Sequence, residues 1–252
     1  MNARKRFSRL PTAWLSVVII FLVAAMMTAR TVPAFANDKQ ELIRHEQETT
    51  QLVEKARLTL DSFMRDSKMD AFRDLLKQAK GVLIVPQMLK GAFVVGASGG
   101  SGVLLVRDDK TGRWVGPAFY TIGGASFGLQ IGGEASEVVL LVMSHRGITT
   151  LLTNSFKLGA DVGIAAGPVG AGVAASTANL SADILTFSRS KGLYGGISVD
   201  GAVVATRGEW NDAYYGKHVT PTDILVAREV HNPQSVALID DIAKSACTTG
   251  RC

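Results

Sequence analysis

The stretch from Gly91 to Ser144 constrains the fold more than any other part of this 252-residue chain. Its apolar runs are short and are separated by glycine-rich breaks; they cover residues 93–95, 103–106, 119–122 and 138–143. Phe127, Leu129 and Ile131 alternate with small or polar neighbours. Alternation with a period of two is typical of a half-buried antiparallel strand. The pattern predicts a glycine-rich antiparallel sheet built from several short strands.

Turn signals and further apolar runs extend this sheet. Residues 108–112 read Asp-Asp-Lys-Thr-Gly and predict a hairpin loop between two strands. Asp200-Gly201 predicts a two-residue hairpin between strands at 193–199 and 202–206. Glycines inside the strands indicate bulges or places where another backbone approaches closely.

Residues 38–64 have the apolar spacing of an amphipathic helix, with repeats of three and four residues. The stripe consists of Thr49, Val53, Ala56, Leu60 and Phe63. The opposite face carries both charge signs, so it lacks the Lys/Arg excess that is usual for membrane-surface helices. Packing on the sheet is the favoured interpretation, and an additional contact with a membrane is the alternative.

Shorter helices are expected elsewhere. Ser67 and Asp70 have the spacing of a capping box, and Gly81 is expected to end the helix that they start. Residues 148–154 predict another short helix. Near the C-terminus, Thr220-Pro221 and Asn232-Pro233 each place a capping residue before a proline. The predicted fold class is α+β, with two N-terminal helices packed on an antiparallel barrel or sandwich and short C-terminal helices.

The first 36 residues are typical of a secretory signal peptide. A basic segment precedes an apolar run at 13–27, and Ala34-Phe35-Ala36 fits a cleavage site. We therefore expect a signal peptide at 1–36, one domain at 37–252, and an exported protein of the periplasm or cell envelope. Retention of the segment as a membrane anchor is the alternative.

Removal of residues 1–36 would change the net charge of the protein. The chain has 27 Lys and Arg against 22 Asp and Glu, and five of the basic residues fall within residues 1–36. The mature chain is then formally neutral, which argues against nucleic-acid binding. Cys247 and Cys252 are the two cysteines, and the sequence leaves open whether they form a small disulfide loop or remain thiols.

Serine and histidine residues are present, but they lack the sequence spacing that a catalytic or metal-binding site requires. Ser98 and Ser126 each lie in a G-x-S-x-G pattern, but strand rather than helix follows both. The histidines, His45, His145, His218 and His231, are not spaced as metal ligands. The sequence therefore predicts no catalytic residue, no metal site, no cofactor and no enzyme activity.

Several cations lie at positions predicted to be loops. Arg189 and Lys191 fall in a hydroxyl-rich turn at 188–192, which is able to hold a phosphate through charge-assisted hydrogen bonds. An ordinary exposed loop is the alternative interpretation of this turn. Lys90 and Lys217 lie at further loop edges.

Six segments in order carry a resemblance to a known family. They are Gly-Val-Leu-Ile-Val-Pro at 81–86, Trp-Val-Gly-Pro-Ala-Phe at 114–119, Gly-Leu-Gln-Ile-Gly-Gly at 128–133, Ala-Gly-Pro-Val-Gly at 166–170, Ser-Arg-Ser-Lys-Gly-Leu-Tyr-Gly-Gly at 188–196, and Asn-x-x-Tyr-Tyr-Gly at 211–216. With them, roughly residues 40–232 resemble the SYLF domain family.

This resemblance implies lipid binding, since the family is described as binding phosphoinositides and membranes. Some eukaryotic relatives also bind actin and carry an SH3 domain. This sequence differs in its signal peptide, its lack of an SH3-like segment and its charge-balanced first helix, so actin is expected to be an unlikely partner.

The expected function is a non-catalytic phospholipid-binding protein of the bacterial cell envelope, peripheral to the membrane. Its expected partner is an anionic phospholipid or membrane surface. The expected headgroup ligands are Arg189, Lys191, Lys90 and Lys217. The alternative is an envelope structural or interaction scaffold that binds another protein.

Overall fold

The computed structural model describes residues 34–168, 181–190, 193–195 and 199–247, with the backbone alone at 34–37, 92–95, 126–132 and 193–195. The chain divides into the units Met1–Glu41 and Leu42–Cys252, and the packing described below belongs to the second unit. Its helical segments are α2 (Ala34–Arg65, which begins in the first unit), α3 (Asp70–Leu76), α4 (His145–Leu151), α5 (Gly208–Tyr215), the π-helix η1 (Asp223–Ala227), the 3₁₀-helix η2 (Pro233–Ser235) and α6 (Val236–Ala246). Its strands are β1 (Gly81–Arg107), β2 (Trp114–Val142), β3 (Ser155–Lys157), β4 (Ile164–Ala166), β5 (Ile184–Ser190), β6 (Leu193–Gly195) and β7 (Val203–Thr206).

Two long strands replace the short ones predicted for this region. β1 pairs antiparallel with β2 from Gly81 opposite Val142 to Arg107 opposite Trp114. The prediction of glycine-rich breaks was wrong because glycine keeps both backbone hydrogen-bonding groups and so can continue a ladder. Three register shifts interrupt the pairing, as expected for bulges. The predicted hairpin loop after residue 107 is confirmed.

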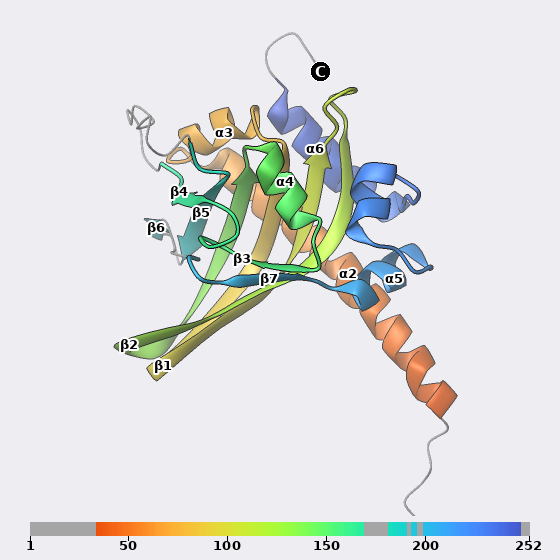
Figure 1. Ribbon diagram of the computed structural model, residues 1–252, viewed down its shortest axis with the longest axis horizontal. Helices are drawn as coiled ribbons and strands as arrows, with labels where there is room; N and C mark the ends of the chain where they lie inside the picture. Colours follow the sequence, from red (N-terminus) through yellow and green to blue (C-terminus); the bar gives the residue numbers. More distant parts are fainter. Residues whose placement is uncertain (1–33, 169–180, 191–192, 196–198, 248–252) are drawn as a thin grey trace, which may run out of the picture. The chain divides into compact units, whose positions relative to one another are not determined.

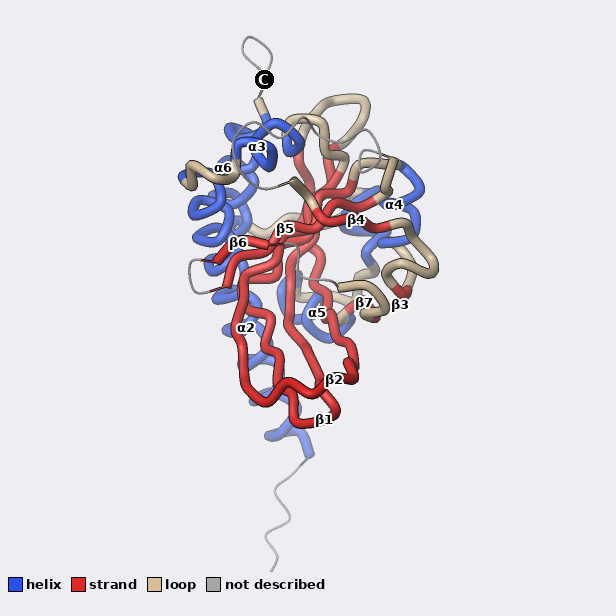
Figure 2. Tube along the Cα trace, turned by 90° about the vertical axis from the view of Figure 1, so that its left-hand side faces the viewer, coloured by secondary structure: helices blue, strands red, loops and turns tan. Residues whose placement is uncertain are grey.

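The paired β1–β2 ribbon turns back on itself (Figure 2). The Arg107 N–H donates to the Lys80 carbonyl at 2.7 Å, so the two ends of β1 lie side by side. A Cβ atom built on Gly102 would lie 2.8 Å from the Ile84 carbonyl oxygen, and one on Gly100 would lie 2.5 Å from that of Gln87. These glycines therefore permit the close backbone approach that glycine within a strand indicates.

β2 is the central strand of the sheet and pairs with β1, β5 and β7. β5 pairs with its C-terminal part, β7 pairs with residues Tyr120 to Gly123, and β3, β4 and β6 extend the sheet from β7 and β5. All of these pairs are antiparallel except β4 with β5. The α+β prediction is confirmed. The predicted turn at Asp200-Gly201 is present, since the Ala202 N–H donates to the Val199 carbonyl at 3.0 Å. In the described parts of the two strands, however, β6 pairs with β5 and β7 pairs with β2 and β3; residues 196–198 lie outside the described residues.

Both faces of the sheet are buried, so the strands read as continuous apolar runs rather than alternating ones. Val82, Ile84 and Phe187 pack on one face against α2, α3, α5 and α6. Leu83 and Val85 point to the other face, where α4, η1 and β3 cover the sheet. Figure 1 shows α2, α3 and α6 on the side of the sheet away from α4. The side chains of Phe127, Leu129 and Ile131 lie outside the described residues.

The first predicted helix is confirmed as α2, and its predicted stripe is 0–3% exposed. The capping box at Ser67 is wrong: α3 starts after Met69, and the Asp66 carboxylate accepts from the Lys68 N–H instead (2.9 Å). Gly81 opens β1 rather than ending α3. The C-terminal caps are confirmed, since the Asn232 amide oxygen accepts from the Gln234 N–H (3.0 Å) and Thr220 exchanges hydrogen bonds with Asp223.

Two further expectations concern the ends of the chain. Cys247 is disulfide-bonded, and Cys252, the other cysteine of the sequence, lies outside the described residues. Residues 1–33 also lie outside them, so the signal peptide stays a prediction. Within the described ranges, no helix has both the length and the apolar character needed to cross a membrane.

Candidate functional site

Of the predicted headgroup ligands, the described ones, Lys90, Arg189 and Lys217, do not line one common cavity. Lys90 lies within β1 and lines a cavity that neither Arg189 nor Lys217 lines. Arg189 belongs to β5, which extends through the first residues of the predicted turn. Lys217 is exposed after α5, and Lys191 lies outside the described residues.

Arg189 ties helix α2 to the sheet. Its guanidinium donates from two nitrogens to Glu137 Oε2, with the Nε contact at 2.7 Å. Thr59 of α2 donates to the other oxygen of Glu137 at 3.1 Å. The Arg189 guanidinium carbon also lies 5.6 Å from the ring centre of Phe63. The side chains of Arg189 and Glu137 are 23% and 28% exposed, so the pair is partly shielded from water. This geometry gives Arg189 a structural role.

Replacing Arg189 with alanine is expected to lower the free energy of unfolding by about 2 kcal/mol. Removing one partner leaves the Glu137 carboxylate half-buried and unpaired, at a cost below the ~3–5 kcal/mol of a fully buried pair. Chemical denaturation measures the change. Arg65→Ala is the control, because Arg65 is 79% exposed and its pair with Asp61 should contribute less than about 1 kcal/mol. Unchanged stability together with lost vesicle binding would contradict this structural role.

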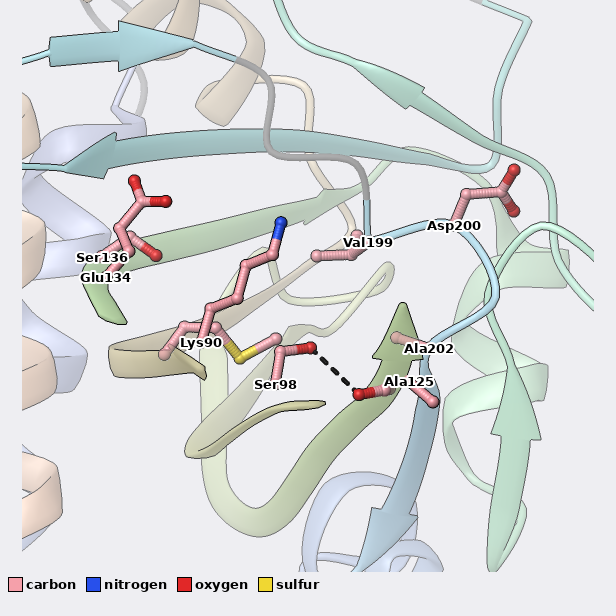
Figure 3. Close-up of a pocket in the computed structure, with 10 residues that line it drawn as sticks. Lys90, Ser98, Ala125, Glu134, Ser136, Val199, Asp200 and Ala202 are labelled. Carbon is pink, nitrogen blue, oxygen red and sulfur yellow. Dashed lines mark hydrogen bonds between the residues drawn. The ribbon is translucent and has the colours of Figure 1, made fainter. Parts of the chain in front are cut away.

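A cavity of about 240 Å³ lies beside the β1–β2 ribbon and is the candidate site. Its charged lining residues are Lys90 of β1, Glu134 of β2 and Asp200 of the segment before β7. Lys90 and Glu134 are register partners, so their side chains lie on the same face of the ribbon. Figure 3 shows the Lys90 side chain extending into the cavity, with its ammonium group between Val199 and the Glu134–Ser136 wall. Within the described part of the chain, Lys90, Glu134 and Asp200 form no ion pair.

Two serines complete the polar lining of this cavity. Ser136 is 6% exposed, and its hydroxyl makes no hydrogen bond among the described residues. Ser98 donates to the Gly124 carbonyl at 3.4 Å, a long hydrogen bond (Figure 3). The sequence predicts Lys90 but misses Glu134, Asp200 and Ser136. Their common signal would have been the strand register, which places Glu134 opposite Lys90.

A second hollow of about 250 Å³ lies between α2, β1 and Trp210 of α5. Next to it, the Arg207 guanidinium stacks on the Trp210 ring at 3.4 Å and donates to Ser101 Oγ at 2.9 Å. Burial lowers the pKa of Arg207, against the smaller opposing effects of Glu48 and Glu209. Arg207 is thus held by contacts within the fold, whereas Lys90 faces its cavity without an ion-pair partner in the described chain.

The loop that carries Lys217 also contains a pH-sensitive pair. His218 Nδ1 lies 2.9 Å from Asp212 Oδ2, and this hydrogen bond, with the attraction of the same carboxylate, raises the pKa of His218. Because the folded-state pKa is raised, the pair stabilises the fold fully below the ordinary value of about 6.5. That stabilisation is lost as the pH rises through the folded-state pKa.

The imidazole signals of His218 in an NMR titration should therefore report a pKa above about 6.5. Asp212→Asn should return it toward that value, because the amide removes the negative charge but keeps an oxygen to accept from the Val219 N–H (3.0 Å). A pKa that is the same in both proteins would contradict this explanation.

The structure also places the residues that were excluded as catalytic or metal-binding. Ser98 and Ser126 lie inside β1 and β2, without the strand-to-helix turn that activates a nucleophilic serine. Over the described ranges, no group of three or more His, Cys, Asp or Glu side chains is arranged to hold a metal ion.

Comparison with known proteins finds similarity to one family and to several of its curated members. Residues 123–245 match the Ysc84 family, described as "Las17-binding protein actin regulator". Protein YSC84 of Saccharomyces cerevisiae is 35% identical over 159 residues, which cover 61% of this chain and 33% of YSC84. LAS seventeen-binding protein 3 of the same yeast is 34% identical over 160 residues, 62% of this chain and 34% of that protein.

The human SH3 domain-containing YSC84-like protein 1 is 31% identical over 153 residues, 60% of this chain and 44% of that protein. The chain thus spans less than half the length of these curated relatives. The description of the family names binding and regulation, and the name of the second yeast relative names binding.

The expectation that actin is an unlikely partner is contradicted by this match. It relied on the signal peptide and the absent SH3-like segment, whereas the matched family is described as an actin regulator. The family match itself agrees with the resemblance found in the sequence, although it begins at residue 123, inside β2. Residues 123–245 of this chain therefore match the Ysc84/SYLF family.

Proposed function

We propose that this chain is a non-catalytic module that binds phospholipid headgroups through the cavity beside Lys90. The observation that carries the proposal is an ammonium group that extends into a cavity and has no ion-pair partner among the described residues. A lysine in this position can neutralise one phosphate oxygen through a charge-assisted hydrogen bond. The cavity is smaller than the ~300–1,000 Å³ of sites for drug-sized ligands, so it suits a headgroup rather than acyl chains.

Vesicle sedimentation tests this proposal. Lys90→Ala should weaken binding to phospholipid vesicles about ten-fold, the loss expected for one charge-assisted hydrogen bond of ~1.5 kcal/mol. Lys217→Ala is the matched control, because Lys217 is exposed and does not line the cavity. Equal binding by both variants, or no vesicle binding by the unaltered protein, would refute the proposal.

Binding of a protein of the actin-regulating machinery is the second candidate function. It is favoured by the description of the matched family and by the yeast relative named for binding LAS seventeen. Co-sedimentation with actin filaments, in parallel with vesicles, separates the candidates. Filament binding without vesicle binding would favour the second candidate, and the reverse would favour the first. An envelope scaffold that binds another protein would instead co-purify with a stoichiometric partner.

Export to the cell envelope is a separate part of this proposal. The basic segment, apolar run and Ala34-Phe35-Ala36 site support removal of residues 1–36. Mass spectrometry of the mature protein should then find Asn37 at the N-terminus. An intact Met1 in a membrane fraction would indicate a retained anchor instead.

A further inference from the structure

We propose that the Lys90 cavity recognises a zwitterion in which a primary amine is joined to a phosphate, the phosphoethanolamine class. This proposal rests on the proposed function and specifies the headgroup. It starts from the signs of the charges around the cavity. Lys90 supplies a positive charge and Glu134 a negative charge, whereas the carboxylate of Asp200, which also lines the cavity, lies against Gly159.

This charge balance disfavours a purely anionic ligand. A phosphate placed beside Lys90 would also meet the carboxylate of Glu134, its register partner, and like charges repel. A purely cationic ligand would in turn meet Lys90. A ligand that carries both signs satisfies Lys90 and Glu134 together, because each of its groups has an opposite charge on the wall.

The placement of these groups fits two ends of one small molecule. Lys90 and Glu134 are neighbours across the β1–β2 ladder, whereas Asp200 comes from the segment before β7. Figure 3 shows the Lys90 ammonium group beside the Glu134 wall, whereas the Asp200 carboxylate points away from it. The phosphate would contact Lys90, and the amine would contact a carboxylate.

Ser136 adds the hydrogen-bonding capacity that a phosphate requires. Ser136 is only 6% exposed and lines the cavity. Its hydroxyl makes no hydrogen bond with another described residue. Because the Ser136 Oγ is accessible at the cavity wall, it can donate to an acceptor oxygen of a bound ligand. Ser98, with its long hydrogen bond, supplies a second donor to the same cavity.

Calorimetry with three soluble probes tests the zwitterion directly. O-phosphoethanolamine should bind at least ten-fold more tightly than inorganic phosphate or ethanolamine, since each of these lacks one of the two charges. Equal affinity for phosphate, or for ethanolamine, would overturn the proposal. So would no binding of phosphoethanolamine.

Two cavity variants should change the affinities for phosphoethanolamine and phosphate in different ways. A variant that merely fails to fold would lose both affinities. Glu134→Gln should weaken phosphoethanolamine binding about ten-fold but strengthen phosphate binding, because the repelling carboxylate is removed. Lys90→Met should weaken the binding of both. Glu229→Gln, at an exposed position outside the cavity, is the control and should change neither. If Glu134→Gln weakens both probes equally, the carboxylate does not hold the amine and the proposal fails.

Vesicle binding distinguishes a lipid headgroup from a free, soluble molecule of the same chemical class. Vesicles of phosphatidylcholine with phosphatidylethanolamine should bind the protein more tightly than vesicles with phosphatidylglycerol, and Glu134→Gln should remove this preference. Vesicle binding that follows negative charge alone would overturn the zwitterion but leave the proposed lipid function intact. Binding of soluble phosphoethanolamine without vesicle binding would uphold the zwitterion and refute the lipid function.

Discussion

Replacing Phe72 with alanine is expected to lower the free energy of unfolding by about 4 kcal/mol, within the ~3–5 kcal/mol range for buried aromatic residues. Phe72 of α3 is fully buried. Its ring meets Phe63 of α2 with centroids 5.4 Å apart and Phe187 of β5 with centroids 5.2 Å apart, both edge to face. One side chain therefore joins two helices to the sheet, and its loss leaves a cavity that three elements must close together.

Urea denaturation followed by circular dichroism measures this change. Because domains are usually stable by only about 5–15 kcal/mol, the variant should unfold at a much lower denaturant concentration. Leu58→Ala is the control, since Leu58 is 54% exposed on α2 and its truncation should cost less than about 1 kcal/mol. A loss below about 1.5 kcal/mol for Phe72→Ala would show that this aromatic contact is not part of the core.

Gly102→Ala should destabilise the fold by about 3 kcal/mol, the upper end of the ~1–3 kcal/mol typical of overpacking. The added Cβ would lie 2.8 Å from the Ile84 carbonyl oxygen and 2.8 Å from a methyl carbon of Val85. Both neighbours belong to the buried first part of β1. Since the carbonyl is part of a ladder, it cannot move away without loss of backbone pairing.

Gly91→Ala is the matched control in the same strand. A Cβ at Gly91 would meet nothing within 4 Å, so this change should be neutral or stabilising by up to about 1 kcal/mol. Thermal or urea unfolding of both variants gives the comparison. Equal stabilities would contradict the close approach between the two parts of β1.

The sequence predicts the identities of most elements because local patterns determine them. The stripe of α2, the apolar strands, the 108–112 loop and the cap at Asn232 each depend on residues a few positions apart. Helix α5 was missed, although Trp210, Ala213 and Tyr214 have helical spacing and are buried. In the sequence, residues 211–216 contribute only to the family resemblance.

The sequence does not reveal which residues far apart in the chain contact each other in the fold. Nothing local distinguishes a glycine that ends a strand from Gly102, which lets the strand approach its own first part. Arg189 was assigned to an exposed turn because its partner, Glu137, lies 52 residues away. The sequence predicts Lys90 as a site residue from its charge and an expected place at a loop edge, whereas the structure places it within β1. Its relation to Glu134 and Asp200 required the ladder register and the fold of the 199–202 segment.

The central position of β2 has a consequence for how the protein opens. Residues 136 and 138–142 of β2 pair with both β1 and β5, and residues 120–123 pair with both β1 and β7. Amide hydrogens in these segments can exchange with solvent only when whole ladders separate, so they should be among the last to exchange. β3 and β4 end the described strand order and each pair with a single strand, so their amides can exchange through local opening. A partly unfolded form can therefore lose β3 or β4, whereas loss of β2 also removes the strand against which β1, β5 and β7 are ordered.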